Sequence, residues 1–181
     1  MIINYNLDEN DFLTYQLFIA SKSERIQKKR QRNRFLVLVF YILFGLYGYY
    51  TERTGLLVIF VIIAIAWFFL YPIWERKRYA NHYKGFIKEN YKDRLGKVAT
   101  VEINEAFILT KDETSESRVS TREVKNITDI GSVIFIRWDT SVSLVLPQNK
   151  ITQFDQLRSY LKDLASQVNI DYIVEEEWRC R

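Results

Sequence analysis

The sequence predicts an α+β membrane protein in which a two-helix transmembrane hairpin, with a long basic helix on each side, joins a cytosolic β-rich domain that a C-terminal helix caps. Three observations lead to this prediction. Apolar residues gather in residues 35–74, positive charges gather on both sides of that block, and residues 98–181 show short runs of alternating apolar and polar positions. The average over the chain hides this arrangement, because the mean hydropathy is only −0.16.

The second part of the apolar block, residues 55–74, has no charged side chain. At about 1.5 Å per helical residue it covers about 30 Å, which is the thickness of a bilayer core. A helix buried in the core of a soluble protein is the alternative. It is disfavoured because a chain of 181 residues is too short to cover such a helix on all sides.

The first part of the block, residues 35–50, is marginal in length for a spanning helix. Arg32 and Arg34 precede it, and their long side chains can reach the headgroup region and extend its effective length. The polar residues 51–54 connect the two apolar runs. A short polar turn between two such runs predicts a helical hairpin, and a re-entrant or interfacial first helix is the alternative.

Positive charge borders the block on both sides. Residues 22–34 carry seven Lys or Arg against one acid, and residues 75–97 carry eight against three. The connecting turn carries one charge of each sign. By the positive-inside rule both termini lie in the cytoplasm. The single Cys180 agrees, because a free thiol suits a reducing compartment.

The cations nearest to the two spans are the candidate site residues. We expect them to contact anionic lipid headgroups, at about 1 kcal/mol each near the membrane surface. Nucleic acid is not an expected partner, because the basic patches flank apolar sequence and residues 98–181 carry ten Lys or Arg against fourteen acids. The candidates are Lys28, Lys29, Arg30, Arg32, Arg34, Arg76, Lys77 and Arg78.

Two helices are expected to carry these cations. The first covers residues 8–33, has Asp8 as its N-cap and can run unbroken into the first span, since no Gly or Pro interrupts it. The second covers residues 75–91 and continues from the second span, with a kink at Pro72. An apolar stripe on the first helix packs either on the chain's own helix and domain or on a second copy or partner. The stripe consists of Phe12, Tyr15, Ile19 and Ile26.

Residues 98–181 predict a β-rich domain. Residues 124–130 are ambiguous between strand and helix, and Asp139–Thr140 predicts a tight turn. The chain thus divides into an N-terminal part, a hairpin, a second basic helix and the domain, with bounds 1–34, 35–74, 75–97 and 98–181. Six strands are expected, at residues 98–103, 106–110, 116–121, 133–138, 141–146 and 169–174.

A final helix is expected to open at Thr152, with Asp155 three residues later in a pair that resembles a capping box. Its apolar stripe indicates a helix that packs on the strands. Antiparallel strands closed by one amphipathic helix are the plan of a pleckstrin-homology-like β-barrel. Residues 1–7 form a further extended segment, which we expect to pair with the C-terminal sheet. The stripe consists of Phe154, Leu157, Leu161, Leu164, Ala165 and Val168.

The chain resembles the YcxB-like family of small bacterial membrane proteins over most of its length. The resemblance rests on the order of an extended segment, a helix, two spans and a pleckstrin-homology-like domain. The most specific local match is Leu146-Pro147-Gln148-Asn149-Lys150, which leads into the final helix. The chain departs from the family at Thr121-Arg122-Glu123-Val124, where the family often has Trp. The resemblance implies the bacterial inner membrane and no agreed activity, so it assigns no catalytic residue.

No enzymatic chemistry is predicted. The chain has one His and one Cys, too few for a Cys/His zinc site or an intrachain disulfide, and it lacks nucleotide-binding and hydrolase motifs. No catalytic, cofactor or metal residue is therefore expected. The expected function is a non-enzymatic interaction or regulatory module at the inner leaflet, with membrane lipids and a protein partner or homo-oligomer as partners. An oligomeric transport or immunity component of the inner membrane is the alternative.

Overall fold

The structure is a computed structural model, and it describes residues 1–92, 95–113, 115–138 and 143–178. The chain divides into two compact units. One is helical and covers residues 16–85, while the other, the β unit, combines residues 1–15 with the described part of 86–180. The expected turn at Asp139–Thr140 lies outside the described residues.

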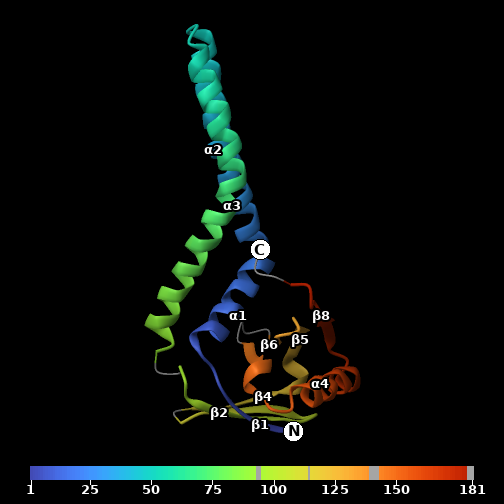
Figure 1. Cartoon of the computed structure of the whole chain (residues 1–181). Helices are drawn as coiled ribbons and strands as arrows, with labels where there is room; N and C mark the ends of the chain where they lie inside the picture. The colour runs from blue at the N-terminus through green and yellow to red at the C-terminus, as the bar shows by residue number, and fades with distance from the viewer. Residues whose placement is uncertain (93–94, 114, 139–142, 179–181) are drawn as a thin grey trace. The chain divides into compact units, whose positions relative to one another are not determined.

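Two long helices dominate the helical unit: α2 covers Glu24–Tyr50 and α3 begins at Thr54 and ends at Asn90. They run side by side and are joined by the short turn between Tyr50 and Thr54 (Figure 1). Both are long and apolar enough to cross a membrane. Only 11% of the apolar window of α2 and 6% of that of α3 are buried in the chain, whereas the core helix of a soluble protein would be mostly buried.

The prediction of one helix over residues 8–33 is wrong in one respect. Helix α1 covers Glu9–Lys22, and Ser23 then adopts an extended backbone with φ −77° and ψ 109°, so that α2 starts anew at Glu24. Ser is a common residue at helix N-caps, although the Ser23 side chain makes no capping hydrogen bond to α2. From Glu24 onward, the basic segment and the first apolar run form one helix, as expected.

Eight strands form two four-stranded sheets in the described part of the β unit. The order is β1-β2-β3-β4 in one sheet and β7-β6-β5-β8 in the other. All pairs are antiparallel except β5 with β8. The strands are β1 (Ile2–Asn6), β2 (Val98–Ile103), β3 (Phe107–Lys111), β4 (Glu116–Ser120), β5 (Val124–Asp129), β6 (Val133–Trp138), β7 (Ser143–Pro147) and β8 (Asp171–Val174).

The predicted pairing of the N-terminal segment is confirmed. Strand β1 lies antiparallel to β2, with Ile3 opposite Val101 and Tyr5 opposite Ala99. Ile3 and Tyr5 are buried and alternate with more exposed neighbours, as expected for a strand with one face on a core. The first residues of the chain therefore complete a sheet whose other strands follow the hairpin in the sequence.

The ambiguous segment 124–130 is a strand over Val124–Asp129, preceded by a short 3₁₀ helix η1 (Thr121–Glu123). Seven strands, rather than the six expected, thus follow residue 97 in the described part of the chain. The spacing of the apolar residues misled the prediction, because Ile127, Thr128 and Asp129 are all buried and the usual alternation of a half-exposed strand is lost.

The final helix α4 covers Phe154–Val168 and carries the predicted apolar stripe on its buried face. The expected capping box at Thr152 is wrong, because the N-cap is Gln153 and no side chain caps the helix. Ile151 and Phe154 both insert into the core, so the chain turns through the two residues between them. The helix ends at Asn169, whose φ of 59° is the left-handed conformation typical of this position.

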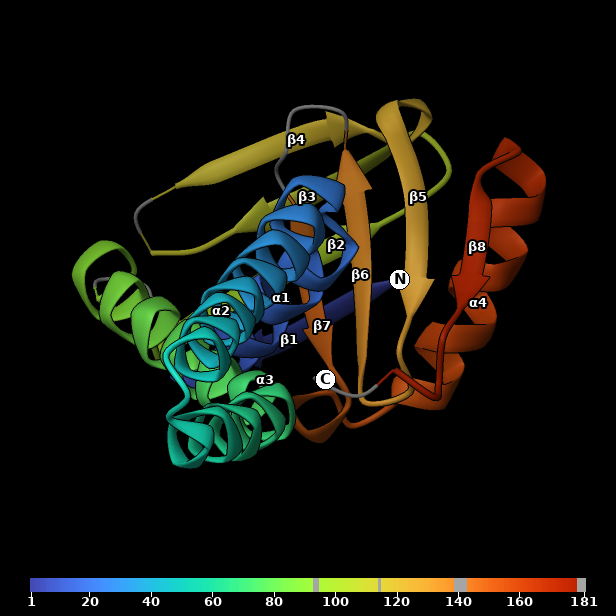
Figure 2. The ribbon, with the colours of Figure 1, turned by 90° about the horizontal axis from the view of Figure 1, so that it is seen from above.

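The core lies between the two sheets and α4. The strands of one sheet cross the direction of those of the other, and α4 runs along the side of β8 (Figure 2). The two sheets do not close into a barrel in the described residues, so that part of the prediction is not shown. One reason is that β5 already has two neighbours, β6 and β8, and therefore has no free edge for β4.

Candidate functional site

Small residues bring α2 and α3 together near the connecting turn. A Cβ atom built on Gly48 would lie 2.9 Å from the Cβ of Leu56, a distance that real side chains avoid. Gly45 is also buried, but its Cβ would meet Phe60 at an ordinary 3.7 Å. The backbone of α2 therefore approaches α3 closely at Gly48, as is common where helices pack through small residues.

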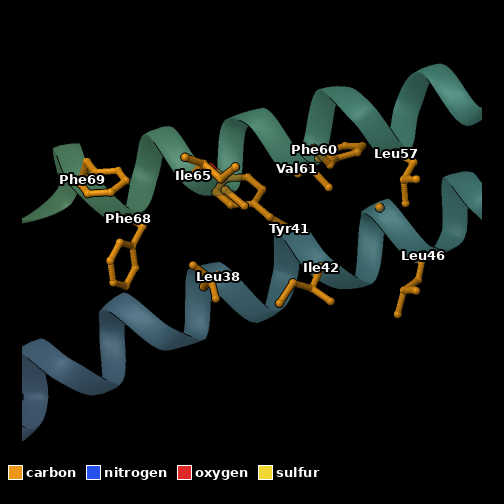
Figure 3. Close-up of a pocket in the computed structure, with 12 residues that line it drawn as sticks. Leu38, Tyr41, Ile42, Leu46, Leu57, Phe60, Val61, Ile65, Phe68 and Phe69 are labelled. Atoms are coloured by element: carbon orange, nitrogen blue, oxygen red, sulfur yellow. The ribbon is translucent and has the colours of Figure 1, made fainter.

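An apolar groove of about 450 Å³ lies between the two helices beyond this contact. Leu38, Ile42 and Leu46 line it from α2, spaced by four residues, and Val61 and Ile65 line it from α3 (Figure 3). The remaining lining residues are apolar or aromatic as well: Tyr41, Gly45, Leu57, Phe60, Ala64, Phe68 and Phe69. The groove offers surface to a hydrocarbon chain and no charged group along its length.

A polar link closes one end of the groove. Pro72 has no N–H, so the carbonyl of Phe68 four residues earlier loses its helical donor. Arg34 of α2 supplies the missing donor, with its Nη2 2.9 Å from that carbonyl oxygen. Its guanidinium also lies 3.7 Å from the centre of the Phe68 ring. Arg34 thus satisfies the backbone group that the proline leaves unpaired, as neighbouring helices often do.

A second link lies one turn earlier on α2. Arg30 donates from Nε to Glu75 at 2.8 Å, and the Tyr71 hydroxyl donates to the other carboxylate oxygen at 3.1 Å. Glu75 is only 5% exposed. Burial of a carboxylate is costly unless it is paired and hydrogen-bonded, and here both oxygens are satisfied. Arg30 and Glu75 therefore form an interhelical ion pair at the basic end of the apolar segment.

The structure separates the eight predicted cations into two groups. Arg30 and Arg34 are half-buried and bind α3 through the links just described. The other six are exposed. Of these, Lys28 pairs with Glu24 on its own helix at 3.2 Å, and Arg78 lies 5.3 Å from the Trp74 ring. The exposed group consists of Lys28, Lys29, Arg32, Arg76, Lys77 and Arg78.

Sequence reasoning missed the interhelical role of Arg30, Arg34 and Glu75. One signal was available, because a proline at position 72 implies an unpaired carbonyl at position 68. The residue that pairs with it could not be identified from the sequence, because that depends on how the two helices align after the turn. Glu75, the only acid between residues 54 and 88, was a second signal.

The β unit contains its own buried charge cluster around Asp129, which is 1% exposed at the end of β5. Its carboxylate accepts hydrogen bonds from Arg158 Nε at 2.7 Å, from the backbone N–H of Gly131 at 2.8 Å and from the Tyr172 hydroxyl at 3.0 Å. Burial, followed by the charge of Asp129, raises the pKa of Tyr172 well above its ordinary value. The cluster joins β5, α4 and β8, since Asp129, Arg158 and Tyr172 come from these three elements. The hydrogen bonds satisfy the buried carboxylate of Asp129, which indicates a structural role for it.

A smaller polar cluster begins α1. Asp8 accepts hydrogen bonds from the backbone N–H groups of Asn10 and Asp11, and Asp11 accepts one from Asp8 in return. This reciprocal pair confirms Asp8 as the N-cap and has the form of a capping box. Lys150 lies 3.1 Å from Asp8. Burial by itself would raise the pKa of the Asp8 carboxyl. The hydrogen bonds from these N–H groups and the charge of Lys150 outweigh burial and hold that pKa below its ordinary value.

The apolar stripe on the first basic helix packs on the chain itself at two of its positions. The Phe12 and Tyr91 rings lie 4.7 Å apart, and the Tyr15 and Phe135 rings lie 5.7 Å apart, both within the β unit. For these residues the first alternative holds, in which the stripe contacts the chain's own elements. Among the described residues, no group of three or more His, Cys, Asp or Glu side chains could hold a metal ion.

Comparison of the chain with protein-family models, with curated proteins and with solved structures finds no match. The resemblance to the YcxB-like family therefore stays a prediction from the residues. What the structure defines is a class: an α+β chain with a pair of helices that are long and apolar enough to cross a membrane and a β unit of two sheets.

Proposed function

We propose that this protein is a non-enzymatic interaction module anchored in the bacterial inner membrane by the α2–α3 hairpin. One observation carries the proposal. Only 11% of the most apolar window of α2 and 6% of that of α3 are buried, and large side chains such as Phe40, Phe44 and Ile62 are more than half exposed. Such a surface would be unfavourable in water and suits a bilayer. Exposed Lys and Arg on both helices border the apolar segment on one side.

In this proposal both termini lie in the cytoplasm, and the six exposed cations contact anionic headgroups. The charge pattern supports the orientation, because the turn around Glu52 and Arg53 carries no excess of positive charge. The β unit is then presented at the inner leaflet. Its four consecutive neighbouring strands β1–β4, followed by β5–β7 and helix α4, support a pleckstrin-homology-like fold and a place in the YcxB-like family, with β8 as an additional strand after the helix.

The β unit is proposed to bind a protein partner or a second copy of the chain. Its interior is occupied by an apolar core and by the Asp129 cluster, whose carboxylate is fully hydrogen-bonded. This supports a role in binding a partner at the surface rather than a role in catalysis. An oligomeric transport component would need polar side chains along the spans. Apart from the connecting turn, where Glu52 and Arg53 are exposed, residues 35–50 and 55–74 carry no charged side chain, which disfavours that alternative.

Labelling of single cysteines tests the topology. The chain has one Cys, at position 180, so Glu52→Cys in a Cys180→Ser background reports on the turn alone. A membrane-impermeant maleimide applied to intact spheroplasts should label this variant. In the unchanged chain, the same reagent should leave Cys180 unlabelled until the membrane is opened. Labelling of Cys180 in intact spheroplasts, or recovery of the chain in the soluble fraction, would contradict the proposal.

Cross-linking in native membranes followed by mass spectrometry tests the partner. The expected result is a cross-linked species that contains the β unit and either a second copy or one recurrent protein. A variant with six exposed cations changed to Gln should still insert, because the apolar segment is unchanged, but should cross-link less through the loss of its fixed orientation. Recovery of the monomer alone from both chains would contradict an interaction module.

A further inference from the structure

We propose that the groove between α2 and α3 binds one anionic glycerophospholipid, with an acyl chain along the groove and the phosphate at Arg34. The proposal rests on the proposed membrane location and adds a specific ligand site to it. The groove of about 450 Å³ is lined by apolar and aromatic side chains spread along several turns of both helices, which fits a hydrocarbon chain (Figure 3).

The charge at one end of the groove determines the kind of lipid. Arg30 is neutralised by Glu75, whereas Arg34 has no carboxylate partner among the described residues. Arg34 lies one helical turn before Leu38, and its guanidinium covers the ring of Phe68, so it adjoins two groove-lining residues. Its Nε is also buried without a hydrogen-bond partner in the described part of the chain. This leaves an uncompensated positive charge where the hydrocarbon surface ends.

Helix α3 contributes a second cation on the same side. Arg76 follows Phe69 by seven residues, a spacing that returns to the same helix face, and it is exposed. Lys77 is also exposed but is turned by about 100° from Arg76, away from the groove. A phosphate bound by Arg34 and Arg76 would receive two guanidinium groups, which favour phosphate geometry.

A second copy of the chain is the other occupant that an apolar groove could accept. Gly45 and Gly48, small residues of the kind that allow helices to approach closely, already face α3 of the same chain. The groove rim is therefore formed by large side chains such as Ile42 and Phe69. Together with the unpaired charge of Arg34, this favours a flexible acyl chain with an anionic headgroup over a second helix.

Native mass spectrometry of the full chain in mild detergent tests the proposal, with phosphatidylglycerol and phosphatidylcholine of the same acyl chains as probes. We expect one phosphatidylglycerol to stay bound at concentrations where phosphatidylcholine is lost. Ile42→Trp should fill the groove and abolish this binding. Leu43→Trp is the matched control, because Leu43 is similarly exposed, at 56% against 50%, and does not line the groove. It should bind as the unchanged chain does.

The headgroup is tested by a second pair of variants. Arg76→Ala should weaken phosphatidylglycerol binding about fivefold, as expected for one cation near a phosphate, whereas Lys77→Ala should leave it unchanged. Equal retention of the two lipids, or equal behaviour of the two Trp variants, would overturn the site while leaving a membrane location intact. A dimer lost only in Ile42→Trp would also overturn it, in favour of a second copy. Recovery of the chain as a soluble protein would overturn both proposals.

Discussion

At the scale of single residues, polar groups inside apolar surroundings decide where this chain can tolerate change. Asp129 and Arg34 illustrate two forms of the same constraint. Asp129 is a buried charge that needs several donors, and Arg34 is a donor that a proline-freed carbonyl needs. In both cases the partner lies far away in the sequence. The loss of one group leaves its buried partner without a hydrogen bond, which costs free energy of folding.

Replacement of Asp129 by Ala should lower the free energy of unfolding of the β unit by roughly 3 kcal/mol, because it leaves Arg158 and Tyr172 without their shared acceptor. Thermal unfolding followed by near-ultraviolet circular dichroism measures this change. Asp155→Ala is the control. Asp155 pairs with the same Arg158 at 3.5 Å but is 89% exposed, so its loss should change stability by less than about 0.5 kcal/mol. Equal effects would contradict the role assigned to Asp129.

Arg34→Ala should destabilise the hairpin by about 1 kcal/mol, because the Phe68 carbonyl loses the donor that Arg34 supplies. Pro72→Ala restores a backbone N–H to that carbonyl. The cost of Arg34→Ala should therefore fall when Pro72→Ala is also present, and a double-mutant cycle of unfolding in detergent measures this coupling. Arg32→Ala, at an exposed position, should show no such coupling. Additive effects of Arg34→Ala and Pro72→Ala would contradict the link.

At the scale of the elements, the helices of the hairpin are positioned by a close approach at one end and polar links at the other. Gly48 allows the backbone contact beside the turn, and Arg30 and Arg34 bind α3 near its basic part. The turn itself places Glu52 in the left-handed region, with φ 58°, between the two helices. The groove is the space that remains between these two contacts.

Gly48→Ala should weaken helix packing by about 1 to 2 kcal/mol, because the new Cβ would lie 2.9 Å from Leu56 and the helices must move apart. Gly45→Ala is the matched control on the same helix. Its Cβ would meet Phe60 at 3.7 Å, so the change should be neutral or slightly stabilising through the higher helix propensity of Ala. Unfolding in detergent measures both, and a greater loss at Gly45 would refute the assigned contact.

At the scale of the whole molecule, the β unit depends on residues from both ends of the chain. Strand β1 supplies Ile3 and Tyr5 to the core, and β8 supplies Tyr172 to the Asp129 cluster. Burial, and next the charge of Asp11, raises the pKa of Tyr5 well above its ordinary value. Burial, and next the charge of Asp129, does the same for Tyr172. Both ends of the chain therefore contribute a phenol that must stay protonated in the folded unit.

This arrangement predicts loss of stability in alkali. A group whose pKa is raised on folding stabilises the fold fully below its unfolded pKa, which is 10.0 for Tyr, and the contribution is lost as the pH rises towards the folded value. The stability of the β unit should therefore fall above about pH 10. Tyr5→Phe should make this fall shallower, as unfolding at stepped pH would show. Tyr50→Phe, at an exposed position in the connecting region, should leave the slope unchanged.

The sequence by itself determined the periodic and compositional features. The apolar block, its borders of positive charge, the connecting turn, the N-terminal strand and the apolar face of α4 all follow from local patterns. The cap at Asp8 also follows, because capping acts over three residues. Errors occurred where local signals compete: the break at Ser23, the start of α4 at Phe154 and the strand β5, whose last three residues are all buried.

Only the tertiary structure decided which distant groups meet. The sequence showed that Pro72 frees a carbonyl, but the alignment of α2 with α3 assigned Arg34 to it and Glu75 to Arg30. Likewise, the sequence did not show that β5 pairs with β6 on one side and with β8 on the other, which leaves it no free edge for β4. The physical reason is the same in each case. Helix and strand periodicity is set by neighbours in the chain, whereas pairing across the fold is set by packing, which a local pattern does not contain.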